Sequence, residues 1–290
     1  MRKILLPLLA FLLIANNIAY AQTIVTDENN NPIEGFGLVK DPRSNAVYFG
    51  KPDSISRTAI YRGILSGGKI QDIRKTPIID KAAQETIPFF SSDGKYIFLF
   101  SNFENNDSKI LDLWYGKHER TGAIKDVKKA AAINTDSVEY YGSISSKGQL
   151  YFTSWRKSSN GKGDIFSSKF KKGKFSPVKQ LDSNINNKFL NSSPAISPKE
   201  EWLIFFTENE NGGDLYVSFL KKERWSKPIK LSEVVNTSDF EFAPVVSDNG
   251  KTLYFSRREK SILSDKQAYH IYKISIDELG LENLKLGAEY

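Results

Sequence analysis

The sequence predicts an all-β protein that folds as a single closed β-propeller of five four-stranded blades. One motif recurs five times, and segments rich in β-branched and aromatic residues stand between turn sequences. Each copy has an acidic or amide residue, which we call the anchor, with Asn or Asp five positions before it and Pro or Gly three positions after it. The anchors, separated by steps of 51, 54, 52 and 50 residues, are Glu34, Glu85, Glu139, Asn191 and Glu241. A period near 50 residues with four short strands is typical of a propeller blade.

Four strands can be assigned to each unit in order. First strands, such as residues 87–91 and 243–247, run into Asp-Gly and Asn-Gly turns, which tolerate positive φ. Second strands are predicted at residues 96–100, 150–153, 202–207 and 253–256. Third strands have the form Asp-apolar-aromatic, beginning at Asp112, Asp164 and Asp214, with His270 and Ala59 in the same place in the last and first units. Fourth strands close the blades, as at residues 177–181 and 228–231.

The prolines and the two ends of the chain indicate how the ring is built. Pro88, Pro194 and Pro244 fall on first strands, and proline is tolerated there because the innermost strand of a blade has one unpaired edge. Residues 23–25 are predicted to be an outer strand with no blade of their own, whereas the last unit has three clear strands followed by a weak segment at 281–286. We therefore expect the N-terminal strand to complete the last blade and remove the exposed edges. A six-bladed ring is the alternative.

The first 21 residues have the pattern of a secretory signal peptide. Arg2 and Lys3 precede an apolar run over residues 4–14, and the small-x-small sequence at 19–21 is a cleavage site. We therefore predict a signal peptide at residues 1–21, a propeller domain at residues 22–290, and an exported protein, periplasmic or extracellular. No later stretch reaches the roughly 18 apolar residues of a membrane span. The absence of cysteine excludes disulfides and zinc–thiolate sites.

Charge indicates little about a partner. The formal net charge of +7 becomes +5 when the two basic residues at positions 2 and 3 are removed. Most lysines lie in turn-like runs such as 169–174 and 221–224, which are typical of solvated hairpin tips. We expect no nucleic-acid partner and a monomeric protein.

Several of the repeated segments resemble a known family. Residues 87–98 and 243–251 look like the PxxSxDGK motif of the WD40-like (PD40) TolB-type β-propeller repeat family, and residues 163–166 and 212–216 resemble its G-x-D-[IL]-Y strand. The resemblance covers residues 23 to about 286 and is poor in the first unit, where the turn is Asp41-Pro42-Arg43-Ser44. It implies a periplasmic or secreted propeller, often a platform for binding proteins.

Few residues in the sequence point to catalysis. His270 occupies the place of the third-strand aspartates, so a structural role is expected, and His118 is expected to be solvated in the hairpin after a third strand. Neither has a second histidine or an evident nucleophile nearby, which argues against a metal site or a catalytic triad. We therefore expect no catalytic residues, no metal and no cofactor.

The five anchors are the one concentration of chemistry in the sequence. Each precedes an innermost strand, so in a closed ring they are expected to converge near one mouth of the central channel and bind cations or basic groups there. The alternative is that each anchor caps the loop between its own blade and the preceding one. Asn191 is the only anchor that breaks the repeat. Trp155, beside Arg156 and Lys157, is a further candidate as an exposed aromatic contact.

Two functions of different classes remain open. The first is a non-catalytic exported scaffold that holds a protein segment or a small ligand at the channel mouth. The second is a glycoside-processing enzyme that uses channel carboxylates, which would need an acid and a nucleophile or base in distinct environments. Near-equivalent glutamates in repeated places do not supply that difference, so the scaffold is favoured.

Overall fold

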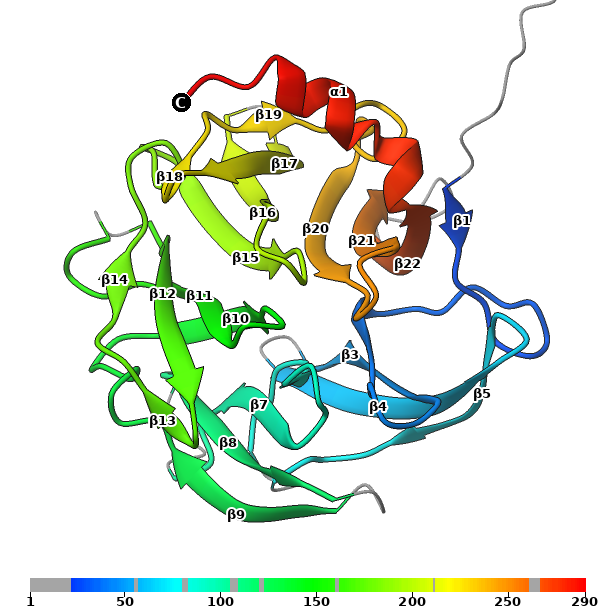
Figure 1. The fold of residues 1–290 in the computed structure, drawn as a ribbon. Coiled ribbons are helices and arrows are strands. Elements are labelled where there is room, and N and C mark those ends of the chain that lie inside the picture. Colours follow the sequence, from blue (N-terminus) through cyan, green and yellow to red (C-terminus); the bar gives the residue numbers. More distant parts are fainter. Residues whose placement is uncertain are drawn as a thin grey trace, which may run out of the picture.

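Five antiparallel sheets stand around one axis in the computed structural model (Figure 1). The described residues are 22–54, 57–79, 83–104, 109–119, 123–159, 162–210, 212–260 and 267–290. The predicted signal peptide and Asp80 lie outside these ranges. Each sheet is one blade, and in the first four blades the strands run outward from the axis in chain order. The five-bladed prediction is therefore confirmed, and the six-bladed alternative is wrong.

The strand bounds follow the repeat. The first blade contains β2 (Phe36–Lys40), β3 (Ala46–Ser54), β4 (Arg57–Ser66) and β5 (Lys69–Lys75). The second contains β6 (Phe89–Phe90), β7 (Tyr96–Ser101), β8 (Asp112–His118) and β9 (Ile124–Lys129). The third contains β10 (Glu139–Ile144), β11 (Gln149–Ser154), β12 (Asp164–Lys171), β13 (Lys174–Phe175) and β14 (Lys179–Gln180). The fourth contains β15 (Leu190–Ile196), β16 (Trp202–Asn209), β17 (Gly212–Lys221), β18 (Arg224–Trp225) and β19 (Ile229–Lys230).

The fifth blade is closed by the N-terminal strand, as predicted. It contains β20 (Phe240–Val246), β21 (Thr252–Lys260), β22 (Gln267–Ser275) and, from the other end of the chain, β1 (Thr23–Ile24). Thr23 pairs with Lys273, Ile24 pairs with Tyr272, and the Val25 amide donates to the Ile271 carbonyl over 2.8 Å. Figure 1 shows β1 beside β22, so the two ends of the propeller lie in one sheet.

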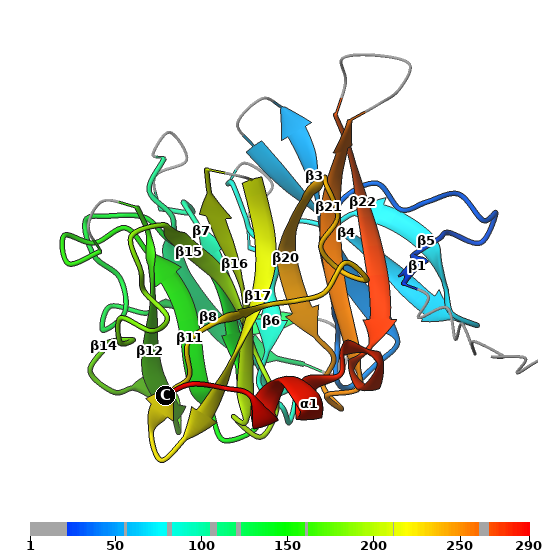
Figure 2. The ribbon, with the colours of Figure 1, turned by 90° about the horizontal axis from the view of Figure 1, so that it is seen from above.

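The weak segment near the C-terminus is helical. A 3-10 helix at Ile276–Leu279 leads into α1 (Leu281–Leu286), which lies along the edge of the fourth and fifth blades in Figure 2. Leu279 and Leu281 are buried in the apolar core that those two blades share. Among the described residues, no helix is long and apolar enough to cross a membrane.

The innermost strands are irregular. Pro194 lies in β15 and Pro244 in β20, and each sits in a bulge where the ladder register shifts. The residues before them, Ser193 and Ala243, have positive φ angles of 52° and 46°. These bulges turn the strands around the axis, and proline fits because a bulge leaves a residue unpaired.

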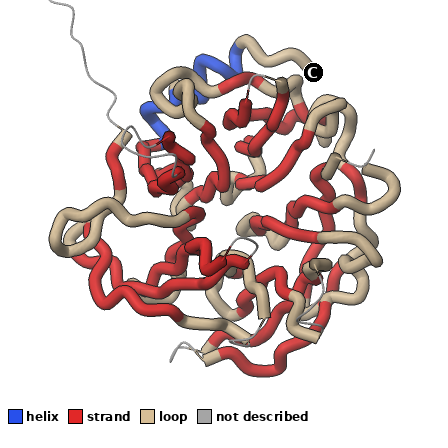
Figure 3. Tube along the Cα trace, turned by 180° about the vertical axis from the view of Figure 1, so that it is seen from behind, coloured by secondary structure: helices blue, strands red, loops and turns tan. Residues whose placement is uncertain are grey.

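The core lies between blades rather than within them. Separate buried apolar clusters join the first blade to the second, the second to the third, the third to the fourth, the fourth to the fifth, and the fifth to the first. Phe36, Ile87 and Ala243 from three blades meet near the axis. A sheet must bury its faces against another element, so the ring in Figure 3 packs each blade against two neighbours.

Two faces of the ring are used below. The upper face carries the anchors and the loops between second and third strands, because Glu139 at the start of β10 pairs with Ser154 at the end of β11. The lower face carries the turns between first and second strands, because Ile144 at the end of β10 pairs with Leu150. The candidate site lies on the upper face.

Candidate functional site

The anchor of the third blade is a buried acceptor for its own loop. Glu139 is fully buried and accepts hydrogen bonds from the Thr135 amide (3.0 Å) and the Thr135 hydroxyl (2.7 Å). The Ser154 hydroxyl on the neighbouring strand donates to Glu139 over 2.8 Å. Burial raises the pKa of Glu139, while these donors and the Arg156 charge oppose that rise.

A guanidinium accompanies the anchor in the third and fifth blades. Arg257 donates to Glu241 over 2.7 Å and to the Val235 carbonyl over 3.0 Å. Arg156 donates to Glu139 over 3.4 Å and to the Ile133 carbonyl, which is equivalent to that of Val235, over 2.8 Å.

The two guanidinium groups reach this shared place from different positions. Arg257 is paired directly with its anchor in the ladder, whereas Arg156 lies two residues beyond the residue paired with Glu139. The two groups lie over the equivalent rings of Tyr272 and Phe166, at 4.4 Å and 4.6 Å from the ring centres.

The fourth blade replaces the charged anchor with an amide and reverses the hydrogen bonding. Asn191 donates to the Asn187 side chain over 3.2 Å and to the Phe189 carbonyl over 2.9 Å. It accepts from the Thr207 hydroxyl over 3.2 Å. No arginine occupies the ladder position opposite Asn191, since Thr207 stands there. The loss of the negative charge and the loss of the guanidinium therefore go together.

The first two anchors differ from the others. Glu85 is buried and accepts from the Ile78 and Ile79 amides over 2.7 and 2.6 Å, within the loop that leads into the second blade. Glu34 is exposed and forms a bridge with His270 of the fifth blade.

The anchors do not line the cavity on the axis. That cavity has a volume of about 30 Å³, the share of liquid volume that one water molecule takes. Its walls come from the bulged inner strands and their neighbours, and the residues are Val39, Ile87, Pro88, Tyr141, Gly142, Ser193, Pro194, Ala243, Pro244 and Val245. The contacts of Glu85, Glu139, Asn191 and Glu241 are those of loop-capping groups.

The other singled-out side chains are also held by protein contacts. Trp155 is half-buried, and its ring centre lies 4.7 Å from that of Tyr140. His270 bonds through Nδ1 to Glu259 over 2.9 Å.

The expectation for His118 is wrong. Its side chain is buried at the end of β8, because the turn of the first blade lies across it. Arg43 donates to the His118 carbonyl over 2.6 Å, and Asp41 Oδ2 lies 3.8 Å from His118 Nε2. The Phe90 ring packs 5.0 Å from the imidazole.

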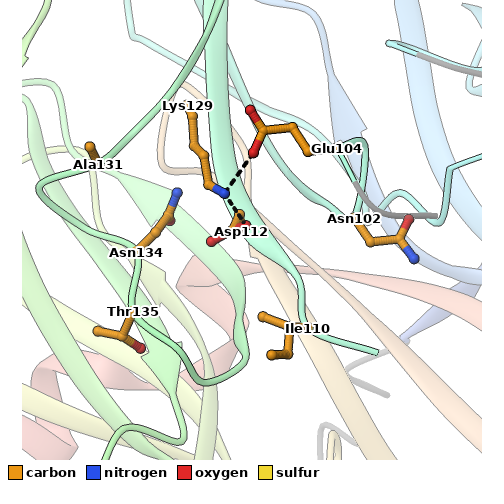
Figure 4. Close-up of a pocket in the computed structure, with 8 residues that line it drawn as sticks. All are labelled: Asn102, Glu104, Ile110, Asp112, Lys129, Ala131, Asn134 and Thr135. Carbon is orange, nitrogen blue, oxygen red and sulfur yellow. Dashed lines mark hydrogen bonds and ion pairs between the residues drawn. The ribbon is translucent and has the colours of Figure 1, made fainter. Parts of the chain in front are cut away.

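A groove on the upper face, beside the second blade, is the best candidate for a binding site. We call it the blade-2 groove. It has a volume of about 460 Å³, within the usual range of ligand pockets. Its lining residues are Asn102, Glu104, Ile110, Asp112, Lys129, Ala131, Asn134 and Thr135 (Figure 4). One wall comes from the described ends of the loop between β7 and β8 with the start of β8, and the other comes from the end of β9 and the loop into the third blade.

The charges of the blade-2 groove are centred on one ammonium. Lys129 Nζ lies 2.8 Å from Asp112 Oδ2 and 2.9 Å from Glu104 Oε2 (Figure 4). The hydrogen bond to Asp112, followed by that to Glu104, raises the pKa of Lys129. With two carboxylates around one ammonium, the groove has an excess of one negative charge. Asn134 lines the groove and is fixed by two hydrogen bonds to the Leu113 backbone, of 2.7 and 3.1 Å.

The position equivalent to the blade-2 groove is covered by a loop in the third blade and has a single described wall in the fourth blade. In the third blade, Gln180 donates to Asp164 over 2.7 Å and to the Ser158 carbonyl over 3.1 Å, so the upper loop folds across the site. In the fourth blade, Lys230 pairs with Asp214 at 2.7 Å beside an open groove of about 820 Å³. Among the described residues, the lining of that groove comes from the segment 230–238.

A substitution within the repeat distinguishes the loop between β7 and β8, from which one wall of the groove comes. Phe103 lies at the position of Arg156 and packs edge-on against Trp114, with ring centres 5.2 Å apart. Trp114 is the equivalent of Phe166 and Tyr272, so an aromatic ring stands here where the other two blades have a guanidinium. Sequence reasoning missed the groove. The aspartates at the start of third strands form a visible repeat, but the repeat does not show that their lysine and glutamine partners lie about 16 residues further along the chain.

The fold and the site define a five-bladed β-propeller with a charged groove on one face. No protein-family model matches the chain, and no curated protein matches it. Solved structures with a similar fold include TolB from Acinetobacter baumannii, at 15% identity and a TM-score of 0.47, covering 83% of this chain and 54% of that one.

The putative TolB from Agrobacterium tumefaciens is 12% identical with a TM-score of 0.49, over 87% of this chain and 78% of that one. A chain of the nidogen/laminin complex is 18% identical with a TM-score of 0.48, over 81% and 80%. The present chain spans about half the length of the Acinetobacter TolB chain, and at these identities the similarity concerns the fold alone.

Proposed function

We propose that this protein is an exported, non-catalytic β-propeller of the TolB type that binds a basic peptide segment in the blade-2 groove. The groove carries the proposal, because it combines two carboxylates, one ammonium and an apolar rim between two walls of the protein. Export is supported by the basic, apolar and small-x-small pattern of the first 21 residues. The TolB type is supported by the repeat motifs quoted above.

The two carboxylates of the groove differ in how firmly they are held. Asp112 is mostly covered, with 16% of its side chain exposed, whereas 58% of the Glu104 side chain is exposed. An exposed ion pair is worth only about 0–1 kcal/mol. Glu104 can therefore leave Lys129 at little cost and accept a lysine or arginine from a partner, while Asp112 keeps Lys129 in place.

Apolar contacts beside these charges favour a peptide over an isolated cation. Ile110 is 38% exposed at the rim of the groove, and Ala131 lies on the opposite wall. A segment that presents a basic side chain next to an apolar one would satisfy Glu104 and cover Ile110 together. Specific sites of this kind are mostly preformed, with few placed polar groups.

A catalytic function has less support in this geometry. A glycosidase needs two carboxylates in distinct environments. In the blade-2 groove, Glu104 and Asp112 differ in exposure, but both form an ion pair with the same ammonium, that of Lys129, so they lack the separate charge surroundings of an acid and a base. The buried anchors Glu85, Glu139 and Glu241 each accept hydrogen bonds from a separate loop.

The test is a binding experiment on the chain that begins at Gln22. Two blocked pentapeptides, one alternating lysine with leucine and one alternating glutamate with leucine, are titrated by calorimetry. We expect binding of the lysine peptide alone, weakened by salt, with the Trp114 fluorescence as a second readout because Lys129 lies 5.8 Å from that ring.

Two variants locate the binding. Glu104→Gln should weaken the lysine peptide at least 5-fold, whereas Glu233→Gln in the groove of the fourth blade should leave its Kd unchanged. Equal binding of both peptides, or full affinity in Glu104→Gln, would overturn the proposed site. Export is tested separately by N-terminal sequencing of the protein recovered outside the cytoplasm, which should begin at Gln22.

A further inference from the structure

A second pocket lies on the lower face, at the seam where the fifth blade meets the first. Its volume is about 340 Å³. We call it the seam pocket and define it by Leu38, Lys40, Val246, Asp248 and Tyr254, which are among its lining residues. It is remote from the blade-2 groove, since its walls come from β2, β20, β21 and the turn after β20.

Three other pairs of neighbouring blades join their lower turns directly. Arg43 of the first blade donates to the Gly94 carbonyl of the second over 3.2 Å. The Ser146 amide of the third blade donates to the Pro198 carbonyl of the fourth over 3.0 Å. Pro198 in turn packs against Gly250 of the fifth. At the seam, the pocket occupies the place that such turn contacts have elsewhere.

Asp248 differs from the residues at the equivalent position of the other four units, and its carboxylate is not required to form the turn. The second position of this turn is Pro42, Ser92, Ser146 and Pro198 in the other four units. The turn of the fifth blade is held by its neighbours, since Asn249 accepts from the Ser247 hydroxyl over 2.7 Å and from the Lys251 amide over 3.0 Å. No hydrogen bond or ion pair of the Asp248 carboxylate occurs among the described residues.

Charges of both signs line the seam pocket. Asp248 is exposed as a residue, yet partial desolvation of its carboxylate raises its pKa, while the Lys40 charge opposes this rise and the Asp41 charge adds to it. Burial, together with the Asp248 charge, also raises the pKa of Tyr254. Lys40 donates only to the Asp41 carbonyl, over 3.4 Å, and forms no ion pair with the carboxylates of the described chain. A carboxylate and an ammonium thus face one pocket without pairing with each other.

We propose that the seam pocket binds a small zwitterion, a free amino acid or a dipeptide. Asp248 accepts hydrogen bonds from the ligand's α-ammonium, and Lys40 donates to its carboxylate. The side chain of the ligand lies against Leu38, Val246 and the Tyr254 ring. Unlike charges on the two walls fix the direction of the ligand, because the reversed orientation would place like charges together. The volume matches the lower end of the range for ligand pockets, about 300 Å³.

The experiment uses blocked ligands, so that it does not depend on any variant folding. Alanylalanine, its N-acetyl form and its C-terminal amide are titrated by calorimetry into the chain beginning at Gln22. We expect alanylalanine to bind and each blocked form to bind at least 10-fold more weakly. Absence of binding by alanylalanine at millimolar concentration, or equal Kd values for the three compounds, would overturn the proposal.

Three variants then assign the ends of the ligand. Asp248→Asn should abolish the preference for a free ammonium, and Lys40→Gln should abolish the preference for a free carboxylate. Glu201→Gln, an exposed charge change near the equivalent turn of the fourth blade, should leave all three Kd values unchanged. If Asp248→Asn and Lys40→Gln keep the original preferences, the assignment of the two ends fails. Glu104→Gln should have no effect, which separates this site from the blade-2 groove.

Discussion

Asn191 donates a hydrogen bond of 3.2 Å to Asn187, at the two positions where the third and fifth blades have a glutamate that accepts from a threonine. The same loop is therefore held by an anchor that donates in the fourth blade and by an anchor that accepts in the third and fifth blades. Where the anchor is Glu139 or Glu241, a guanidinium balances the buried charge. Where the anchor is Asn191, charge and guanidinium are both missing. The three blades share a loop whose polar groups are hydrogen-bonded to the anchor, although the donor and acceptor atoms differ.

A negative charge placed at the fourth anchor should have no charged partner. In Asn191→Glu, the new carboxylate would face the carbonyl of Phe189 and the side-chain oxygen of Asn187, which now accept from the amide. We expect a loss of about 3 kcal/mol at neutral pH, since an uncompensated buried charge costs about 3–5 kcal/mol. Urea unfolding measures it, with Asn191→Gln as the uncharged control. Equal unfolding free energies for the two variants would contradict this account.

Replacing an anchor glutamate with glutamine should lower the free energy of unfolding most where the contact between the anchor and a guanidinium is shortest. Glu241→Gln leaves Arg257 buried without its carboxylate, so we expect a loss of about 3 kcal/mol. Glu34→Gln, at an exposed position, should stay within about 0.5 kcal/mol of the wild type. The measurement is the unfolding free energy of each variant at pH 7, compared with that of the wild type. If Glu34→Gln and Glu241→Gln both stabilise the fold, the carboxylates repel one another and the predicted binding site at the channel mouth regains support.

The buried anchor of the third blade should make stability depend on pH. Burial raises the pKa of Glu139, so the folded protein holds this proton at a higher pH than the unfolded chain does. Between the unfolded and the folded pKa, the folded state binds more protons, and the stability contribution of this group falls as pH rises.

Glu139→Gln removes that titration and provides the measurement. The unfolding free energy of the wild type minus that of Glu139→Gln should decrease from about pH 4 to pH 7. Glu201→Gln, at an exposed position, is the control and should give a flat difference. A difference that grows toward neutral pH would mean that the folded pKa of Glu139 is lowered instead.

Two glycines with nearly equal φ angles should respond differently to alanine. Gly94 (φ 65°) lies under the Arg43 side chain, which a methyl group there would overlap, whereas Gly67 (φ 57°) has open space around it. Both substitutions meet the left-handed penalty of about 1–2 kcal/mol. Gly94→Ala should cost at least about 1 kcal/mol more, because Arg43 must release the Gly94 and His118 carbonyls. Equal midpoints of thermal unfolding would show that Arg43 does not hold the two blades together.

Removal of the closing strand should open the ring. Deleting residues 23–31 exposes the edge of β22 and removes Val25, which is 2% exposed. We expect the free energy of unfolding to fall by several kcal/mol, a large part of the total for a domain. Deletion of Tyr290 alone is the control. An unchanged unfolding midpoint in the longer deletion would mean that β1 contributes little to closure.

Much of the fold was predictable because a propeller is encoded locally. The turns, the alternating strands and the constant period lie within single units of about 50 residues, and hydrogen bonds within a blade follow from that spacing. The missing fourth strand of the last unit and the extra strand at residues 23–25 predicted the closure that β1 and β22 form. The segment at 281–286 was weak as a strand because it is the short helix α1.

The side chains between blades could not be read in the same way. Arg156 and Arg257 stand at different positions of the repeat, yet their guanidinium groups meet equivalent carbonyls and rings. His118 is buried by a turn about 75 residues away, through Arg43. Such contacts depend on the reach of long side chains and on the angle between blades, neither of which a period reveals.

The sequence by itself determined the class of fold, the number of blades and the strand that closes the ring, because these follow from short-range periodicity and turn chemistry. Only the tertiary structure decided that buried anchors such as Glu139 and Asn191 satisfy their own loops, and that Lys129 joins Glu104 to Asp112 in a groove. It also decided that Asp248 faces Lys40 across the seam. Those relationships arise when the ring closes and brings distant segments together, so that burial and charge act between blades.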